Sequence, residues 1–244
     1  MKEDVLMYED FAREQLGFSF HDIGLLVTAL THRSYVNEHK KAHDHNERLE
    51  FLGDAVLELV ASDFLYRNFN EPEGVMTALR AALVRTESIG DAGKKLGYEP
   101  LVRLSKGERQ GSERAHDVIL ADCFEAVIGA IYLDQGYDVA KEFITKHILS
   151  KIDVILAEGS WRDPKSYVQE LAQKVDGVTP VYRTLSEDGP DHDKTFRVGL
   201  YVGSKLVGTG EGHSKQEAQT KAAKEGVKKY HGEGKAQVIH RVQL

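Results

Sequence analysis

The chain has 244 residues, of which 41% are hydrophobic, so it is long enough to form packed cores in one large domain or two smaller ones. Its single cysteine, Cys123, excludes an intrachain disulfide and fits a reducing, cytoplasmic location. The formal net charge of −7, taken over the whole chain, argues against nucleic-acid binding.

The charge is unequally divided along the chain. Residues 161–244 contain 14 Lys and Arg against 11 Asp and Glu, a net charge of +3, which leaves −10 for residues 1–160. An acidic part followed by a mildly basic part indicates different roles for the two, although an excess of +3 is small enough to arise by chance. The N-terminus lacks the apolar run of a secretory signal, and the apolar stretch 119–133 is too short and too charged to span a membrane.

Residues 1–157 are predicted to form an all-helical domain. Apolar side chains recur at helical spacing in the stretches Ile23–Leu30, Leu49–Leu65, Met76–Ile89, Ile119–Tyr132 and Val139–Leu156. The connections, such as 70–74 and 105–114, are short and polar, and no strand-like alternation is present. Because each amphipathic helix must bury its apolar stripe against another, we expect a helical bundle.

Residues 158–162 are predicted to be a linker, and residues 163–231 a small α+β domain. A helix begins at Asp163-Pro164, because Asp accepts a free backbone N–H and Pro lacks one, and it runs to about Val175. A last helix runs from the Ser214 cap to about Tyr230. Between them lie three alternating stretches, Val181–Ser186, Thr195–Val202 and Lys205–Gly210. The order is therefore α-β-β-β-α, and residues 232–244 are predicted to be a tail without regular structure.

The segment 45–65, HNERLEFLGDAVLELVASDFL, places three carboxylates on one helix face. At about 100° per residue, Glu50 lies about 60° from Glu47 around the helix axis, and Asp54 lies about 20° from Glu47. Glu50 and Asp54 are one turn apart, so their repulsion destabilises an isolated helix by about a few tenths of a kcal/mol. A cation or a basic partner is therefore expected near this face.

A second acidic pair, Asp122 and Glu125, shares a helix face within the otherwise apolar segment ILADCFEAVIGAIYL at 119–133. Carboxylates on a largely buried helix need a partner or a metal. Two acidic pairs on two inward-facing helices supply four oxygen donors, which suits Mg²⁺ or Mn²⁺, and phosphodiester hydrolysis uses such a site. On spacing alone, two alternatives stay open: a solvated face whose acids pair with Arg48 and other bases, and acids that cap or pair within a bundle.

Several motifs together resemble the ribonuclease III family. HNERLEFLGDAVL at 45–57 resembles the family signature, and ALTHRSY at 29–35, PEGVMTALRAALV at 72–84 and ILADCFEAVIGAIYLD at 119–134 resemble its flanking motifs in order. DPKSYVQELAQ at 163–173, GPDHDKTF at 189–196 and GTGEGHSKQEAQTKAA at 208–223 resemble a double-stranded RNA-binding domain. Together these segments span nearly the whole chain, a highly specific combination.

The resemblance implies a cluster that binds Mg²⁺, or Mn²⁺ in its place, formed by Glu50, Asp54, Asp122 and Glu125. Asp54 and Glu125 would be the residues most directly required for catalysis. Glu47 and Glu73 match further family acids, with supporting roles in the cleft and in RNA contact. The family is homodimeric with one cleavage centre per subunit, and its products carry a short 3′ overhang, a 5′-phosphate and a 3′-hydroxyl.

Phe51 borders the acidic face, at about 40° from Glu47. Within one subunit, packing at the edge of the core would explain an aromatic residue there. In the family, the matching aromatic side chain inserts into a cavity of the partner subunit. The resemblance therefore implies that Phe51 lies in a homodimer interface.

The second domain is expected to hold double-stranded RNA. This module reads the shape, the 2′-hydroxyls and the phosphates of the duplex over ~16 base pairs. His192 would reach a second minor groove, and Lys215, at a helix N-terminus, would hold phosphates of the intervening major groove. The family often has a further lysine where this chain has Gln216, which puts the strength of that contact in doubt. The first helix would present to one minor groove a polar face, which an ordinary solvated helix also has, formed by Ser166, Gln169, Glu170 and Gln173.

The sequence thus predicts a homodimeric enzyme that cuts double-stranded RNA, chiefly structured ribosomal and messenger RNA precursors, with no membrane partner. One alternative is a non-catalytic RNA-binding protein that uses an inactive nuclease fold as a dimerisation scaffold, against which the intact acids argue. Another is a metal-dependent phosphoesterase without duplex preference, against which the α-β-β-β-α domain argues.

Overall fold

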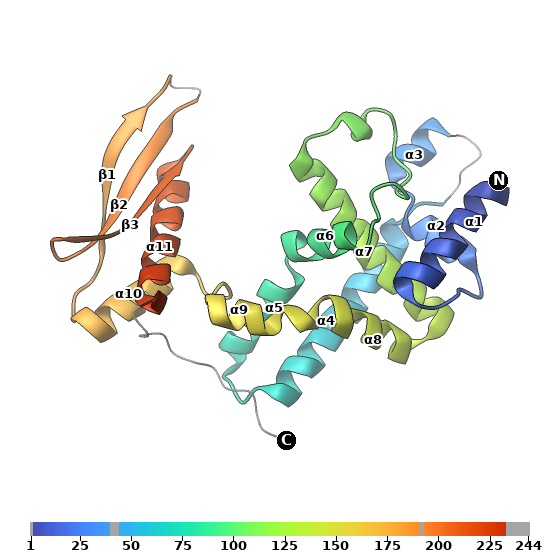
Figure 1. The fold of residues 1–244 in the computed structure, drawn as a ribbon, viewed down its shortest axis with the longest axis horizontal. Coiled ribbons are helices and arrows are strands. Elements are labelled where there is room, and N and C mark those ends of the chain that lie inside the picture. Colours follow the sequence, from blue (N-terminus) through green and yellow to red (C-terminus); the bar gives the residue numbers. More distant parts are fainter. Residues whose placement is uncertain (1, 40–43, 191–192, 233–244) are drawn as a thin grey trace. The chain divides into compact units, whose positions relative to one another are not determined.

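The computed structural model describes residues 2–39, 44–190 and 193–232. The chain divides near residue 153 into two compact units, one of helices and one with a three-stranded sheet (Figure 1). An all-helical domain followed by an α+β domain was predicted from the sequence, and this fold class is confirmed. The division falls within α9 (Ile152–Glu158), close to the predicted boundary at residue 157.

Short connections join the helices of the first unit. In chain order they are α1 (Lys2–Phe11), the π-helical turn η1 (Ala12–Leu16), α2 (Ile23–Ala29), α3 (Arg33–Glu38), α4 (Glu47–Asn68), α5 (Glu73–Val84), α6 (Thr86–Lys95), the 3-10 turn η2 (Glu108–Gln110), α7 (Glu113–Gln135), α8 (Tyr137–His147) and the 3-10 turn η3 (Leu149–Lys151). An isolated parallel bridge joins Thr31 to Arg103.

Two of the predicted helical stretches are interrupted. The stretch 76–89 is divided between α5 and α6 at Arg85, whose φ of −63° and ψ of 148° are not helical. The stretch 139–156 is divided between α8 and α9 by η3. Ile148 and Ile152 are both fully buried, so the apolar pattern continues across the break and does not indicate where the helix is interrupted.

Helix α7 is the centre of the first unit and packs against α4 and α6. Every residue from Ile119 to Ile131 is buried except Asp122 and Glu125, which are half-buried. These two carboxylates are thus the polar positions of a helix that is otherwise enclosed by apolar side chains. Within the described residues, no helix combines the length and the apolar character needed to cross a bilayer.

Helices α4 and α7 cross at a pair of glycines. A Cβ atom on Gly53 would lie 1.7 Å from the carbonyl oxygen of Glu125, and one on Gly129 would lie 2.3 Å from the carbonyl oxygen of Leu49. Both separations are well below any real Cβ contact, so the two backbones touch and only glycine fits. The crossing brings together the acidic positions that flank it, which are Glu50, Asp54, Asp122 and Glu125.

The second unit has the predicted α-β-β-β-α order. It consists of α10 (Pro164–Asp176), β1 (Val181–Asp188), β2 (Thr195–Val202), β3 (Lys205–Gly212) and α11 (Lys215–Gly232). The Asp163 and Ser214 side chains accept backbone N–H groups at the starts of α10 and α11, as predicted. β1 and β3 each extend two residues beyond their predicted ends, and α11 includes residue 232 of the predicted tail. The rest of that tail lies outside the described residues.

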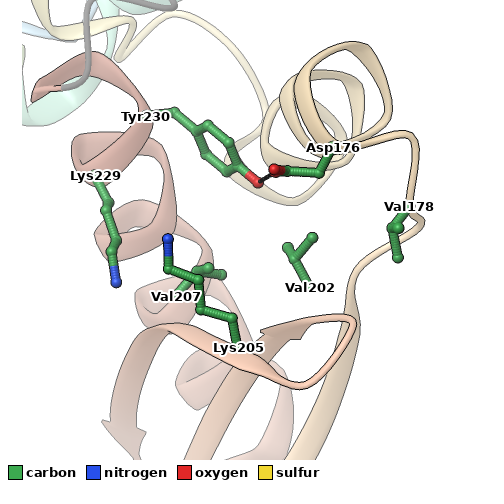
Figure 2. A pocket seen from close by; sticks show the side chains of 7 residues that line it. All are labelled: Asp176, Val178, Val202, Lys205, Val207, Lys229 and Tyr230. Carbon is green, nitrogen blue, oxygen red and sulfur yellow. Dashed lines mark hydrogen bonds between the residues drawn. The ribbon is translucent and has the colours of Figure 1, made fainter.

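The strands form an antiparallel sheet in the order β1-β2-β3, and α11 packs on β2 and β3. Gly208 and Gly210 of β3 face Ala222 and Ala218 of α11, whose backbone a Cβ atom would meet at 2.3 and 2.2 Å. At one end of this unit, the hydroxyl of Tyr230 donates to Asp176 and ties α11 to α10 beside a cavity of about 150 Å³ (Figure 2). Lys205 and Lys229 are among the described residues that line it, and Asp176 is the one acidic residue among them.

The glycine crossing makes a direct prediction. Gly53→Ala should lower the free energy of unfolding by about 1–3 kcal/mol or more, because the new methyl group must separate two backbones in contact. Gly74→Ala is the matched control: it lies in the first turn of α5, where a Cβ meets nothing within 4 Å. It should leave stability unchanged or raise it by up to about 1 kcal/mol. Urea unfolding of both variants checks this, and equal stabilities would contradict the crossing.

Candidate active site

The start of α4 is fixed by a buried asparagine. The Asn46 backbone N–H donates to the Thr31 carbonyl at 2.9 Å, and its carbonyl accepts from the Glu50 N–H at 2.9 Å. The Asn46 side-chain amide donates to the Cys123 sulfur at 3.7 Å, which connects α4 directly to α7. Asn46 is 1% exposed and so has no access to solvent partners. Neither this residue nor the glycine pair was singled out from the sequence.

The structure brings the four predicted metal-binding acids together, two from α4 and two from α7. Burial, followed by the charges of Asp122, Glu47 and Asp54, raises the pKa of Glu50. Burial also raises the pKa of Asp122, although the nearby His32 opposes the shift. These shifts indicate that the carboxylates lie close enough to repel one another.

Glu125 is the most strongly affected of these acids. Burial first, and then the charges of Asp54, Asp122 and Glu50, raise the pKa of Glu125 to about 8. The charge of Glu58 adds to these, so a half-buried carboxyl on an apolar helix faces four other acids. In the described part of the chain, none of the four predicted metal-binding carboxylates forms an ion pair with a basic side chain. One alternative left open above was pairing with Arg48, and the described part of the chain has no ion pair between Arg48 and any of these four acids.

The donor set has the chemistry that a hard divalent cation requires. Four carboxylates supply oxygen donors, while burial raises the pKa of the neighbouring Cys123 thiol and keeps it protonated. Among the described residues, no three acid, imidazole or thiol groups already stand in a metal-binding arrangement. The side chains would therefore have to rotate toward one another to hold an ion.

The supporting acids have other partners. Glu47 is exposed and pairs with Arg33 at 3.3 Å and His45 at 3.8 Å. Glu73, at the start of α5, is exposed and accepts from the Thr77 hydroxyl at 3.0 Å. Glu73 is not among the charges that shift the pKa values of the crossing acids, whereas the charge of Glu47 contributes to raising the pKa of Glu50. Glu58, one turn beyond Asp54, pairs with a base as well, the Arg80 guanidinium at 2.8 Å.

Phe51 does not pack at the edge of the core. Its side chain is 81% exposed, and two further apolar residues of α4, Leu59 and Tyr66, are 58% and 78% exposed. A hollow of about 480 Å³ on the surface of α4 and α5 is lined by Leu59 and Tyr66 but not by Phe51, and its lining also includes Leu65, Met76 and Arg80. One helix thus carries an unburied aromatic side chain and part of an apolar hollow.

In the second unit, the polar face predicted on α10 is present, since all four of its side chains are exposed: Ser166, Gln169, Glu170 and Gln173. Lys215, at the start of α11, pairs with Glu187 of β1 at 2.6 Å and lies over the Phe196 ring. Gln216 beside it is exposed. The predicted contact residue His192 lies outside the described residues.

Family models match both units: "Ribonuclease-III-like" over residues 22–152 and "Double-stranded RNA binding motif" over residues 164–230. Ribonuclease 3 of Enterococcus faecalis is 45% identical over 219 residues, which cover 88% of this chain and 94% of that protein. Ribonuclease 3 of Oceanobacillus iheyensis is 46% identical over 216 residues, covering 86% and 93%. The solved nuclease domain of ribonuclease III from Campylobacter jejuni matches with a TM-score of 0.51 at 38% identity, covering 57% of this chain and 96% of that one.

The raised pKa of Glu125 predicts a pH-dependent stability difference. Between the ordinary value of 4.5 and about 8, the folded chain keeps a proton that the unfolded chain releases, so Glu125 lowers stability as pH rises. Glu125→Gln should therefore stabilise the metal-free chain at pH 8, by about 1–3 kcal/mol after screening by solvent and neighbours. The difference should shrink toward pH 4.5.

Urea unfolding with a chelator at pH 5 and pH 8 measures this difference. Glu142→Gln, at an exposed position of α8, is the matched control and should show no gain at either pH. A Glu125→Gln chain that is less stable than the original at pH 8 would contradict the proposed repulsion.

Proposed function

The chain belongs to the ribonuclease III family, and we propose that it is a divalent-cation-dependent endoribonuclease that hydrolyses phosphodiester bonds in double-stranded RNA. The observation that carries this proposal is the meeting of four carboxylates, none in an ion pair among the described residues, at the crossing of α4 and α7. A catalytic site of oxygen donors on the first unit and an RNA-binding motif on the second supply the two parts that the reaction needs.

The cation is proposed to be Mg²⁺, with Mn²⁺ as a substitute, held by Glu50, Asp54, Asp122 and Glu125. When bound, such an ion supplies hydroxide near neutral pH and offsets charge on the phosphate and on the leaving oxygen. The carboxylates would hold it, and their mutual repulsion, which adds to burial in raising the pKa of Glu125, would then be offset. Asp54 is exposed while Glu125 is half-buried, so the site has an open side on which an RNA backbone can approach.

We infer supporting roles for Glu47, whose charge acts on neighbouring Glu50, and for Glu73; both are exposed and are placed to contact RNA or a second subunit. The second unit would hold the duplex through the polar face of α10 and through Lys215. Structured ribosomal and messenger RNA precursors in the cytoplasm are the proposed substrates.

A homodimer is proposed from the surface of α4. Phe51 is exposed on one side of a helix that also lines an apolar hollow, and a second copy can cover both. The related Campylobacter jejuni structure is described as flexible in a region involved in dimer formation. Two centres in one dimer, each cutting one strand, would leave 5′-phosphate and 3′-hydroxyl ends with a short 3′ overhang.

The proposed chemistry predicts that Asp54→Asn and Glu125→Gln abolish cleavage but keep duplex affinity, because each removes an anionic donor while most RNA contacts stay in place. Glu58→Gln is the matched control and should cleave nearly normally, since Glu58 pairs with Arg80. The measurement is gel-resolved cleavage of a defined duplex with Mg²⁺, beside binding of the same duplex with a chelator. Full cleavage by either variant would refute the site, and a wild-type chain that binds without cleaving would favour the scaffold alternative.

The proposed interface predicts that Phe51→Ala weakens dimerisation. The loss has an upper guide of about 3–5 kcal/mol, the value for a buried aromatic side chain. Leu206→Ala, an exposed apolar position in the other unit, is the control and should dimerise like the original chain. Sedimentation across a concentration series measures both, and an equally tight Phe51→Ala dimer would remove Phe51 from the interface.

A further inference from the structure

Two residues just before the matched RNA-binding motif pack onto α10. Trp161 and Arg162 precede residue 164, where the matched RNA-binding motif begins, yet they belong to the second compact unit. The Arg162 guanidinium carbon lies 4.4 Å from the centre of the Trp161 ring and 4.2 Å from that of the Tyr167 ring. Tyr167 is a buried residue of α10, so the two rings hold the guanidinium against that helix. Residues predicted to be a linker therefore form part of a side-chain cluster.

The same guanidinium contacts the polar face of α10. Its Nη1 atom lies 3.6 Å from Oε2 of Glu170. The Arg162 side chain is only 16% exposed, whereas that of Glu170 is 69% exposed. Arg162 thus approaches the carboxylate from the protein side and leaves its outer side open. In the described part of the chain, Glu170 forms no ion pair with any other base.

A carboxylate on an RNA-binding face has opposing properties. It accepts a hydrogen bond from a ribose 2′-hydroxyl, the group that distinguishes RNA from DNA. It is also repelled by the phosphates on both sides of the groove. A guanidinium held beside it offsets this repulsion and limits the positions that a flexible glutamate can adopt.

We propose that Arg162 is a positioning residue that holds the Glu170 carboxylate as an acceptor for a 2′-hydroxyl and screens it from the phosphates. The preference of this chain for RNA then depends on a side chain that lies outside the matched motif. The inference rests on the proposed function, in which the polar face of α10 meets the minor groove of the duplex.

A purely structural role for Arg162 makes different predictions. If the guanidinium only joined Trp161 to Tyr167, its loss would weaken every nucleic-acid complex alike, and it would do so whether or not residue 170 carried a charge. Coupling to Glu170 and dependence on the 2′-hydroxyl are therefore the properties to measure.

The experiment compares the full chain with R162Q, E170Q and the double variant in the presence of a chelator. The probes are an RNA duplex and an RNA–DNA hybrid of the same sequence, whose DNA strand lacks 2′-hydroxyls. R162Q and E170Q should each weaken RNA duplex binding by roughly tenfold, the effect of losing one good charged contact. Both should weaken hybrid binding less, and the double variant should bind about as well as either single variant.

Two further variants keep the test decisive. R162K retains the charge beside Glu170 but cannot stack as a plane on the two rings, so it should keep most of the RNA preference. If circular dichroism shows that R162Q folds poorly, R162K replaces it in the comparison. K205Q removes a positive charge from the first residue of β3 and should change binding to both duplexes equally.

Equal losses on both duplexes, or losses that multiply in the double variant, would overturn the role of Arg162 while leaving the RNA-binding face intact. An R162K chain as weak as R162Q would also overturn it, in favour of stacking. An unaltered chain without RNA preference, or an E170Q chain without any loss, would instead contradict the proposed contact of α10 with RNA.

Discussion

The contact of two helix backbones at Gly53 and Gly129 determines the geometry of the candidate active site. With no side chain between them, α4 and α7 approach until a Cβ on Gly53 would lie 1.7 Å from the Glu125 carbonyl oxygen. The acids that flank the crossing then lie on adjoining surfaces of two helices that share one core. Asn46 adds a second connection between the helices through its contact with Cys123, which fixes the first turn of α4. The acidic cluster thus depends on residues that carry no charge.

The clustered carboxylates lower the stability of the metal-free fold and favour the binding of a cation. Asp122 and Glu125 interrupt a helix that is otherwise buried from Ile119 to Ile131, and their burial raises the pKa of both carboxyl groups. Apolar residues at these positions would make a more stable core, so the acids are explained better by binding than by folding. A divalent cation at the crossing would offset the repulsion and connect α4 to α7, which makes metal binding and stability two aspects of one interaction.

Much of the fold and of the site could be predicted from the sequence, because helical periodicity places Glu50 and Asp54 on one face and Asp122 and Glu125 on another. The pattern within a helix does not say which helix it meets, so the glycine crossing was not predicted. The break at Arg85 was missed because the apolar spacing continues through it. The pairing of Lys215 with Glu187 joins α11 to β1, and the stacking of Arg162 involves residues that precede the matched motif, so no motif indicates either contact.

The central claim is that one cation is shared between α4 and α7. The most direct measurement is the anomalous scattering of Mn²⁺ in crystals of the full chain. We predict an anomalous peak at the glycine crossing, with carboxylate oxygens from both helices at about 2.0–2.6 Å, the range of hard-cation sites. A peak that contacts acids of one helix alone, or Mn²⁺ bound only elsewhere on the chain, would contradict the account.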